Sequence, residues 1–497
     1  MELCKEYKSL NSSFEKDVLC ESFELDFQEN LPQYLDDIER IVKCSVKSVV
    51  TDYECTGGAI KLYGKNIISI TYLNSSNCLL SNIFEEDFSK PVSAGTGGDI
   101  EFAQITLTAK YSNFRLINQR RIDIHTSLKA RITVFSKNEE KCLTNCKNAF
   151  VREYNPTRLL EKCSGICSEE FDENFTVSNT DSQIRNIVNT FAVCFVEEKK
   201  IIKDKMLVKL RMEISVLYES ESSSIEKSVH TFSLSKIIDV TNAGEDDTAL
   251  VTAQVSGLYV KAKANSNNQL CDIEAVGKVT FNYKICSVCQ DEYIIDSYMP
   301  KYEADIERSN ICIKSNPVYY YDDKTAEINF ETEKNVIEIL DLKASVTDCI
   351  VEESRMILSV LLAFLYYDDS SQLCYFEKTQ EYSMTLNDVK MSGTLSAVML
   401  SYDYLIKNAN TVSLKINFEY SAYLYSSENV SIITDINASA EKNTDCIPQL
   451  TLYFGQKNED VWDIAKKFST DMSLIMDEND LKSEVLDCQK VLLVPGM

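Results

Sequence analysis

The chain has 497 residues, which suggests about three or four domains, and its 44% hydrophobic and 26% charged residues are those of an ordinary folded protein. Its formal net charge of −26 argues against nucleic acid and anionic lipid as partners, because both require clustered Lys and Arg. The longest apolar run, 356–367, is too short to cross a membrane, and residues 1–10 lack the apolar core of a secretory signal. We therefore expect a cytoplasmic protein with no membrane insertion.

A unit of about 145–150 residues recurs three times ahead of residue 448. Its landmark is a long alternating strand that leads through a tyrosine into a polar turn. Another alternating segment precedes each landmark, and two more alternating strands close each unit. Alternation with a period of two residues is typical of sheets with one buried face. The landmarks lie at 67–77, 208–223 and 358–372, and their aligned tyrosines are Tyr72, Tyr218 and Tyr366.

These repeats predict a mainly β fold with three tandem β-rich domains. The chain is rich in Tyr (26) and Phe (21) and poor in Gly (13) and Pro (7), a composition that favours strands. The stretches between the repeats are long for loops, so we expect part of each to be helical or to form an interdomain strap. The predicted domains are 1–137, which includes an N-terminal extension, 174–288 and 327–440, with connectors at 138–173 and 289–326.

The end of the chain, 448–497, has a different pattern. An apolar strand at 450–454 precedes two short amphipathic helices, and a second apolar strand follows at 491–494. The polar and acidic residues 458–460 suit the start of the first helix, and Thr470 is expected to cap the second. The order strand, helix, helix, strand predicts a small α+β module.

This module carries residues that recur in one known domain. They are Trp462, Ile464, Ala465, Asn479 and Leu481, together with 489–495. On these positions the module resembles the LysM domain. The resemblance implies a recognition module and directs the interpretation of the whole chain toward binding.

LysM domains cradle N-acetylated glycans with the loop before the first helix and the loop after the second. Residues 458–460 are Asn-Glu-Asp where LysM domains commonly have Gly-Asp-Thr, and Cys488 replaces a usual Gly. We interpret this added bulk and negative charge as favouring a protein partner, with peptidoglycan or another N-acetylglucosamine glycan as the alternative. The candidate partner- or glycan-binding residues are Lys457, Asn458, Glu459, Asp460, Val461, Asn479, Asp480 and Leu481.

The first repeat contains a second motif, LPQYLDDIERIVKC at 31–44. It is similar to the start of the SPOCS domains of endospore-forming bacteria, and the other two repeats keep its apolar skeleton. Three such domains followed by a LysM domain resemble the SipL-type spore-coat morphogenetic family. The resemblance implies a non-enzymatic adaptor that docks on the ATPase of the coat basement layer, on the mother-cell side of the forespore.

Catalysis receives little support from the sequence. The chain has two histidines, His125 and His230, and no segment suggests a nucleophile with its base. The glycine-rich segment 95–99 lacks the Gly-Lys-Ser/Thr of a phosphate loop and is expected to be a turn. We predict no catalytic residues and no cofactor.

Two of the close cysteine pairs among the 18 cysteines raise the possibility of a metal. Cys286 and Cys289 have the spacing of zinc ligands, and Cys163 with Cys167 could complete a four-thiolate site. No other feature of a zinc site accompanies them, so we interpret the thiols as reduced residues that pack in the core.

Overall fold

The computed structural model describes residues 4–56, 59–93, 100–177, 183–222, 224–386, 391–442 and 448–496. They form 22 β-strands and two short α-helices, which confirms the mainly β fold. The expected turn at 95–99 lies outside the described residues.

Each repeat is built from six successive strands, arranged as two antiparallel sets of three. Their orders are β1-β6-β5 with β2-β3-β4, β8-β13-β12 with β9-β10-β11, and β15-β20-β19 with β16-β17-β18. The first repeat comprises β1 (Lys5–Asn30), β2 (Arg40–Thr56), β3 (Ala59–Leu73), β4 (Leu79–Ser93), β5 (Ile100–Asn118) and β6 (Arg121–Cys146). The second comprises β8 (Thr157–Thr176), β9 (Ile184–Ile202), β10 (Lys205–Ser220), β11 (Ile225–Asp239), β12 (Thr248–Ala264) and β13 (Leu270–Gln290). The third comprises β15 (Tyr302–Glu331), β16 (Glu338–Glu352), β17 (Arg355–Tyr367), β18 (Leu373–Thr385), β19 (Ser392–Asn408) and β20 (Thr411–Glu441).

The two sheets of each repeat pack face to face as a sandwich. The alternating landmark strands supply buried apolar side chains to its core. The landmarks are the central strands β3, β10 and β17, and Tyr72, Tyr218 and Tyr366 are all buried in them. In the third repeat Leu358 and Val360 of β17 share a core with Ile416 of β20 in the opposite sheet. The predicted repeat is therefore a real structural unit.

The three sandwiches are packed around one another, so that each contacts the other two. Strand β4 contacts β9, β18 contacts β2, and Lys227 of β11 pairs with Asp341 of β16. These contacts are equivalent, because each joins the last strand of β2-β3-β4, β9-β10-β11 or β16-β17-β18 to the first strand of another of these sheets. The second and third repeats also share a six-stranded sheet, joined where Arg158 of β8 pairs with Ser315 of β15. We call the three packed sandwiches the head.

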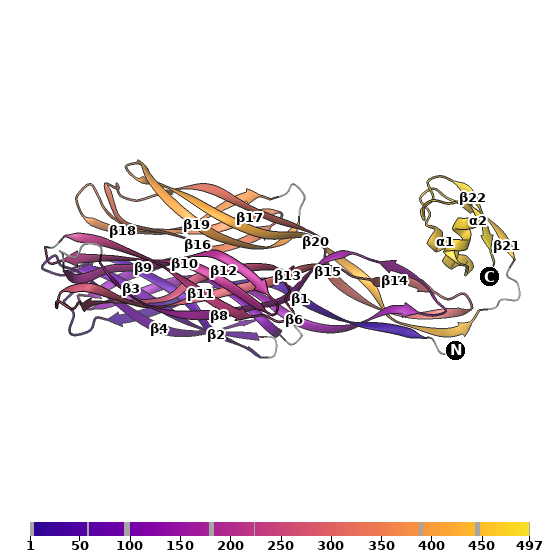
Figure 1. The fold of residues 1–497 in the computed structure, drawn as a ribbon, viewed down its shortest axis with the longest axis horizontal. Helices are drawn as coiled ribbons and strands as arrows, with labels where there is room; N and C mark the ends of the chain where they lie inside the picture. Colours follow the sequence, from indigo (N-terminus) through magenta and orange to yellow (C-terminus); the bar gives the residue numbers. More distant parts are fainter. Residues whose placement is uncertain are drawn as a thin grey trace.

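A stalk extends from the head and carries the C-terminal module near its end (Figure 1). It consists of the outer parts of the β1/β6 and β15/β20 ribbons, with a third ribbon of β7 (Phe150–Tyr154) and β14 (Tyr293–Tyr298). All three ribbons contribute to its interior, where Cys142, Tyr293, Ile311 and Ile432 pack together.

The stalk accounts for the segments predicted as connectors. Residues 138–173 and 289–326 contain strands and turns and no helix, so the helical expectation is wrong. Strand β15 runs through both head and stalk, and many of its residues are exposed. The domain boundaries themselves stay a prediction.

Candidate functional site

The C-terminal module has the predicted strand, helix, helix, strand order. It consists of β21 (Leu450–Gly455), α1 (Val461–Phe468), α2 (Met472–Glu478) and β22 (Lys490–Pro495), and the two strands pair antiparallel. Asp460 is the N-cap of α1, and its side chain accepts a hydrogen bond of 2.9 Å from the Trp462 backbone N–H. The predicted start of the first helix is therefore confirmed.

The second helix is capped by Asp471, so the prediction of Thr470 as its cap is wrong. The Asp471 side chain accepts a hydrogen bond of 2.9 Å from the Ser473 N–H. Thr470 instead completes the end of α1, because Ser469 turns into the left-handed region at φ 55° and the Thr470 N–H then donates to the Ala465 carbonyl at 3.0 Å.

The two predicted binding loops lie side by side. The Asn458 N–H donates to the Leu486 carbonyl at 2.8 Å, and the Leu486 N–H returns a bond of 2.9 Å to the Glu459 carbonyl. The Val461 N–H donates to the Glu484 carbonyl at 2.7 Å. The first loop is thus joined to the end of the second by backbone hydrogen bonds.

Three of the eight candidate residues, Val461, Asn479 and Leu481, have structural roles in the module. Val461 is buried, and Leu481 packs against the same core. Asn479 ties α2 to β22, since its Oδ1 accepts the Leu493 N–H at 2.7 Å and its Nδ2 donates to the Ile475 carbonyl at 2.7 Å.

Of the remaining candidates, Glu459 is hydrogen-bonded within the module, and three others have exposed side chains. Glu459 accepts hydrogen bonds from the Tyr453 hydroxyl at 2.6 Å and the Gln456 N–H at 2.8 Å. Lys457, Asn458 and Asp480 have exposed side chains, and these three are the candidate residues that a partner can reach most directly.

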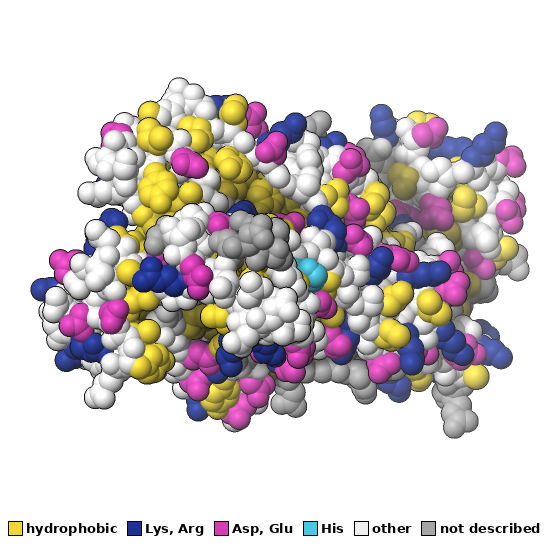
Figure 2. Space-filling view, turned by 60° about the vertical axis from the view of Figure 1, so that its left-hand side comes forward, with side chains coloured by type: hydrophobic (Ala, Val, Ile, Leu, Met, Phe, Trp, Pro, Cys, Tyr) yellow, Lys and Arg dark blue, Asp and Glu magenta, His cyan; other side chains and the backbone are white. Residues whose placement is uncertain are grey.

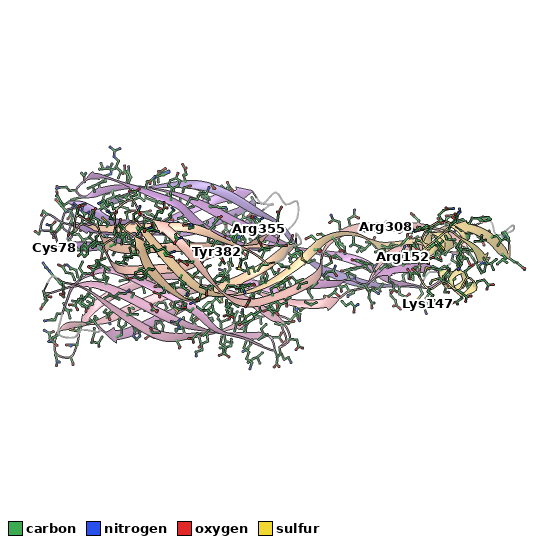
Figure 3. The ribbon with its side chains drawn as sticks, turned by 90° about the horizontal axis from the view of Figure 1, so that it is seen from above. Cys78, Lys147, Arg152, Arg308, Arg355 and Tyr382 are labelled. Atoms are coloured by element: carbon green, nitrogen blue, oxygen red, sulfur yellow. The ribbon has the colours of Figure 1, made fainter. Side chains whose placement is uncertain are left out.

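Asp460 has a partner that the sequence did not reveal. Its Oδ2 lies 2.7 Å from Nη2 of Arg152, on β7 of the stalk. Trp462 also contacts the stalk, because its indole N–H donates to Oδ2 of Asp296 on β14 at 2.9 Å. Figure 3 shows Arg152 and Arg308 along the part of the stalk that lies next to the module.

A second surface of the module lies on the outer face of its two strands. Four of its apolar side chains are half exposed or more: Leu450 (51%), Leu452 (63%), Phe454 (65%) and Val491 (50%). The register pairs Phe454 with Val491 and Leu452 with Leu493, so these side chains form one continuous apolar face. We call it the outer strand face. Adjacent exposed apolar residues of this kind often mark interaction sites.

The sequence contained a signal for the outer strand face. Strand β22 has apolar residues on both of its faces, and Leu492 and Val494 are buried against the helices. The two helices of the module contribute to the core on one side of the pair only. Both faces of this two-stranded sheet are apolar, and the helices cover one of them. The other face is therefore left open.

The structure provides no support for a metal centre. Within the described ranges no group of three or more His, Cys, Asp or Glu side chains is placed to bind a metal ion. Cys286 and Cys289 are three residues apart on β13, so their side chains point to opposite faces of the sheet. Cys286 is buried beside Leu159 and Leu250.

Among the described residues no helix has the length and apolar character needed to span a bilayer.

On the face drawn in Figure 2, basic and acidic side chains are interspersed over head and stalk. This distribution differs from the clustered Lys and Arg that nucleic acid requires.

Comparison with known proteins gives a match inside the head. Searches of curated proteins and of solved structures found no match. A family model described as SipL, SPOCS domain, matches residues 183–263, which run from the start of β9 into β12. The second repeat is therefore similar to a SPOCS domain of the SipL family.

Proposed function

We propose that this protein is a non-enzymatic adaptor in spore-coat assembly and that its C-terminal module docks on a protein partner. The match of residues 183–263 to the SipL SPOCS domain supports a role in sporulation. The other two repeats have the same strand order, and the module that follows them resembles LysM. In a protein of this type the partner is the ATPase of the coat basement layer, and the site of action is the forespore surface on the mother-cell side.

The outer strand face is the observation that carries the proposal. Leu452 and Phe454 are more than three-fifths exposed and lie on a module held at the far end of a stalk. A few residues at the apolar centre of a protein interface supply most of its binding free energy, and aromatic side chains are enriched at such centres. An apolar face of this kind suits a protein surface better than a hydroxyl-rich glycan.

The test is capture of the coat ATPase by the full-length chain. The double variant Leu452→Ser, Phe454→Ser removes the centre of the outer strand face, and Leu474→Ser is the matched control, because Leu474 is 43% exposed on α2. We expect the wild type and the control to capture the ATPase and the double variant to lose it. Equal capture by all three chains would refute the docking role of this face.

The alternative ligand is peptidoglycan, and the same three chains test it in a second assay. Each chain is mixed with purified peptidoglycan and sedimented. The adaptor proposal predicts that the protein stays in the supernatant. Strong sedimentation that persists in the Leu452→Ser, Phe454→Ser variant would assign the module to glycan and overturn the proposal.

A further inference from the structure

One carboxylate of the stalk, that of Asp296, makes several contacts at the interface with the module. Oδ2 of Asp296 accepts the Trp462 indole N–H at 2.9 Å and lies 2.7 Å from Nζ of Lys466, the next residue along the same face of α1. Oδ1 of Asp296 lies 3.0 Å from Nη2 of Arg308 on β15. Burial opposes the charge of Asp296, but the hydrogen bonds from Lys466 and Trp462 bring its pKa below the ordinary value. The carboxylate is therefore charged at neutral pH.

A small aromatic contact lies beside this carboxylate. Tyr298 of β14 is buried, and its ring meets Trp462 edge-on at 4.9 Å between centroids. Its hydroxyl donates to the Thr470 carbonyl at 2.7 Å. Phe150 of β7 also packs on Tyr298, with centroids 5.2 Å apart. Residues of the stalk thus complete one side of the module's core.

A third contact joins the stalk to the two loops of the module. Arg152 of β7 lies 2.7 Å from Asp460 in the first loop and 4.0 Å from Glu484 in the second. One guanidinium therefore bridges the two loops that the sequence singled out as a binding face. The outer strand face, by contrast, remains exposed.

We propose that the end of the stalk is a dock for the C-terminal module, held closed by Asp296 and Arg152, and that the module is released when these ionic contacts are weakened. The closed dock covers Trp462, pairs Asp460 and Glu484 of the loops with Arg152, and leaves the outer strand face open. The released module exposes Trp462 and frees these two carboxylates for a partner. The dock therefore determines which surface of the module a partner meets, whatever that partner is.

The character of the contacts supports a dock that opens. The side chains of Lys466 and Arg152 are 41% and 33% exposed, so salt screens their ion pairs. Among the described residues, the stalk contributes two apolar side chains, Tyr298 and Phe150, to the core cluster of the module. Interfaces between parts of one chain that are small and polar permit relative motion by default.

Trp462 reports the state of the dock directly because it is the only tryptophan of the chain. In the full-length protein, Asp296→Ala should shift its emission to longer wavelength and increase its quenching by acrylamide. Lys466→Ala, a change on an exposed helix surface, should have the same effect without risk to the fold of the stalk. The matched control is Asp305→Ala, because Asp305 is an exposed residue of β15 in the same stalk.

Two further readouts distinguish release from unfolding. Small-angle scattering should give a larger maximum dimension for both dock variants, with the far-ultraviolet circular dichroism of the wild type. Added salt should move the wild-type emission toward that of Asp296→Ala and leave the variant unchanged. The dock is refuted if Trp462 emission and quenching are the same in the wild type, Asp296→Ala and Lys466→Ala, or if Asp305→Ala changes them equally.

Discussion

Asp341 is the residue on which the three repeats converge. The strand registers place it opposite Leu365, as Asn189 lies opposite Leu217 and Lys43 opposite Thr71, so the three residues are equivalent. Nζ of Lys43 donates to Oδ1 of Asn189 at 2.7 Å, and Nδ2 of Asn189 donates to Oδ2 of Asp341 at 3.2 Å. Three equivalent positions have thus become a cation, an amide and an anion in contact.

The charge of Asp341 is balanced by lysines. Lys227 Nζ lies 2.9 Å from its Oδ1, and Lys343 Nζ lies 3.6 Å from its Oδ2. Burial alone would raise the pKa of Asp341, but Lys343 and Lys227 hold it below the ordinary value. Removing the carboxylate would leave Lys343, which is buried and whose pKa burial lowers to about 7, without its counter-ion.

Asp341→Ala should therefore be strongly destabilising, by about 3–5 kcal/mol in the free energy of unfolding. Chemical denaturation followed by circular dichroism measures this change. Asp403→Ala is the control, because Asp403 is exposed on β19, and its effect should stay within about 0.5 kcal/mol. Similar stabilities for the two variants would show that Asp341 is not needed where the repeats meet.

At the scale of single strands, glycines in the sheets lie opposite aromatic residues. Gly277 of β13 is paired in register with Phe171 of β8, and Gly165 of β8 with Tyr283 of β13. A Cβ on Gly277 would collide with the Phe171 ring and lie 2.7 Å from the carbonyl oxygen of Gly257. The ring of Phe171 therefore occupies the space that a side chain at 277 would need.

Gly277→Ala should lower the free energy of unfolding by about 1–3 kcal/mol, because the Phe171 ring must move. Gly257→Ala is a matched control on the adjacent strand β12, since a Cβ there meets nothing within 4 Å. Thermal unfolding of both variants is the measurement. A melting temperature for Gly257→Ala as low as that of Gly277→Ala would contradict the steric argument.

The stalk ribbons depend on an acid-sensitive contact. Asp435 of β20 lies 2.7 Å from Nζ of Lys5 on β1, and the Tyr7 hydroxyl donates to it at 2.8 Å. Burial opposes its charge, but the bonds from Lys5 and Tyr7 lower the pKa of Asp435 to about 2. A carboxyl whose folded-state pKa is lowered stabilises the fold above its unfolded pKa and loses that effect as the pH falls toward the folded value.

Hydrogen exchange at the start of β1 should therefore accelerate as the pH falls from about 4 to about 2, beyond the intrinsic pH dependence of exchange. Asp435→Asn should show the faster exchange already at neutral pH and no further loss of protection in this window. A wild type and an Asp435→Asn variant with the same protection at neutral pH would show that this contact does not hold β1 in the stalk.

Much of the strand pattern was predictable from the sequence, and the stalk was not. Alternation identified β3, β10 and β17 and placed Tyr72, Tyr218 and Tyr366 at equivalent positions, because burial of one face leaves a period of two. The stalk consists of ribbons whose partners are far apart in the sequence, such as β15 and β20. Pairing over such separations leaves no local signal.

The candidate site was likewise predictable in part from the sequence. The N-cap Asp460 and the loops of the module follow from local residue preferences, and the structure places them as expected. The contacts of Asp296 and Arg152 with the module join residues more than 160 and more than 300 positions apart. They lie in segments that the sequence marked as connectors, so no motif pointed to them.

At the scale of the molecule, the packing of the three repeats implies that they unfold together. A cluster between the repeats contains buried residues of all three, among them Val42, Val188 and Leu365. The second and third repeats share a sheet, and Asp341 ties β16 to β9 and β11. Loss of one repeat would expose apolar faces of the other two.

Denaturant unfolding followed by circular dichroism should therefore give one transition for the head. Leu365→Ala, which leaves a cavity in the shared cluster, should move the entire transition by about 2–5 kcal/mol. Trp462 fluorescence reports on the dock and module in the same samples and should change at lower denaturant. If only about a third of the circular dichroism amplitude moved in Leu365→Ala, the repeats would be independent domains on one chain, and the head would not be a single cooperative unit.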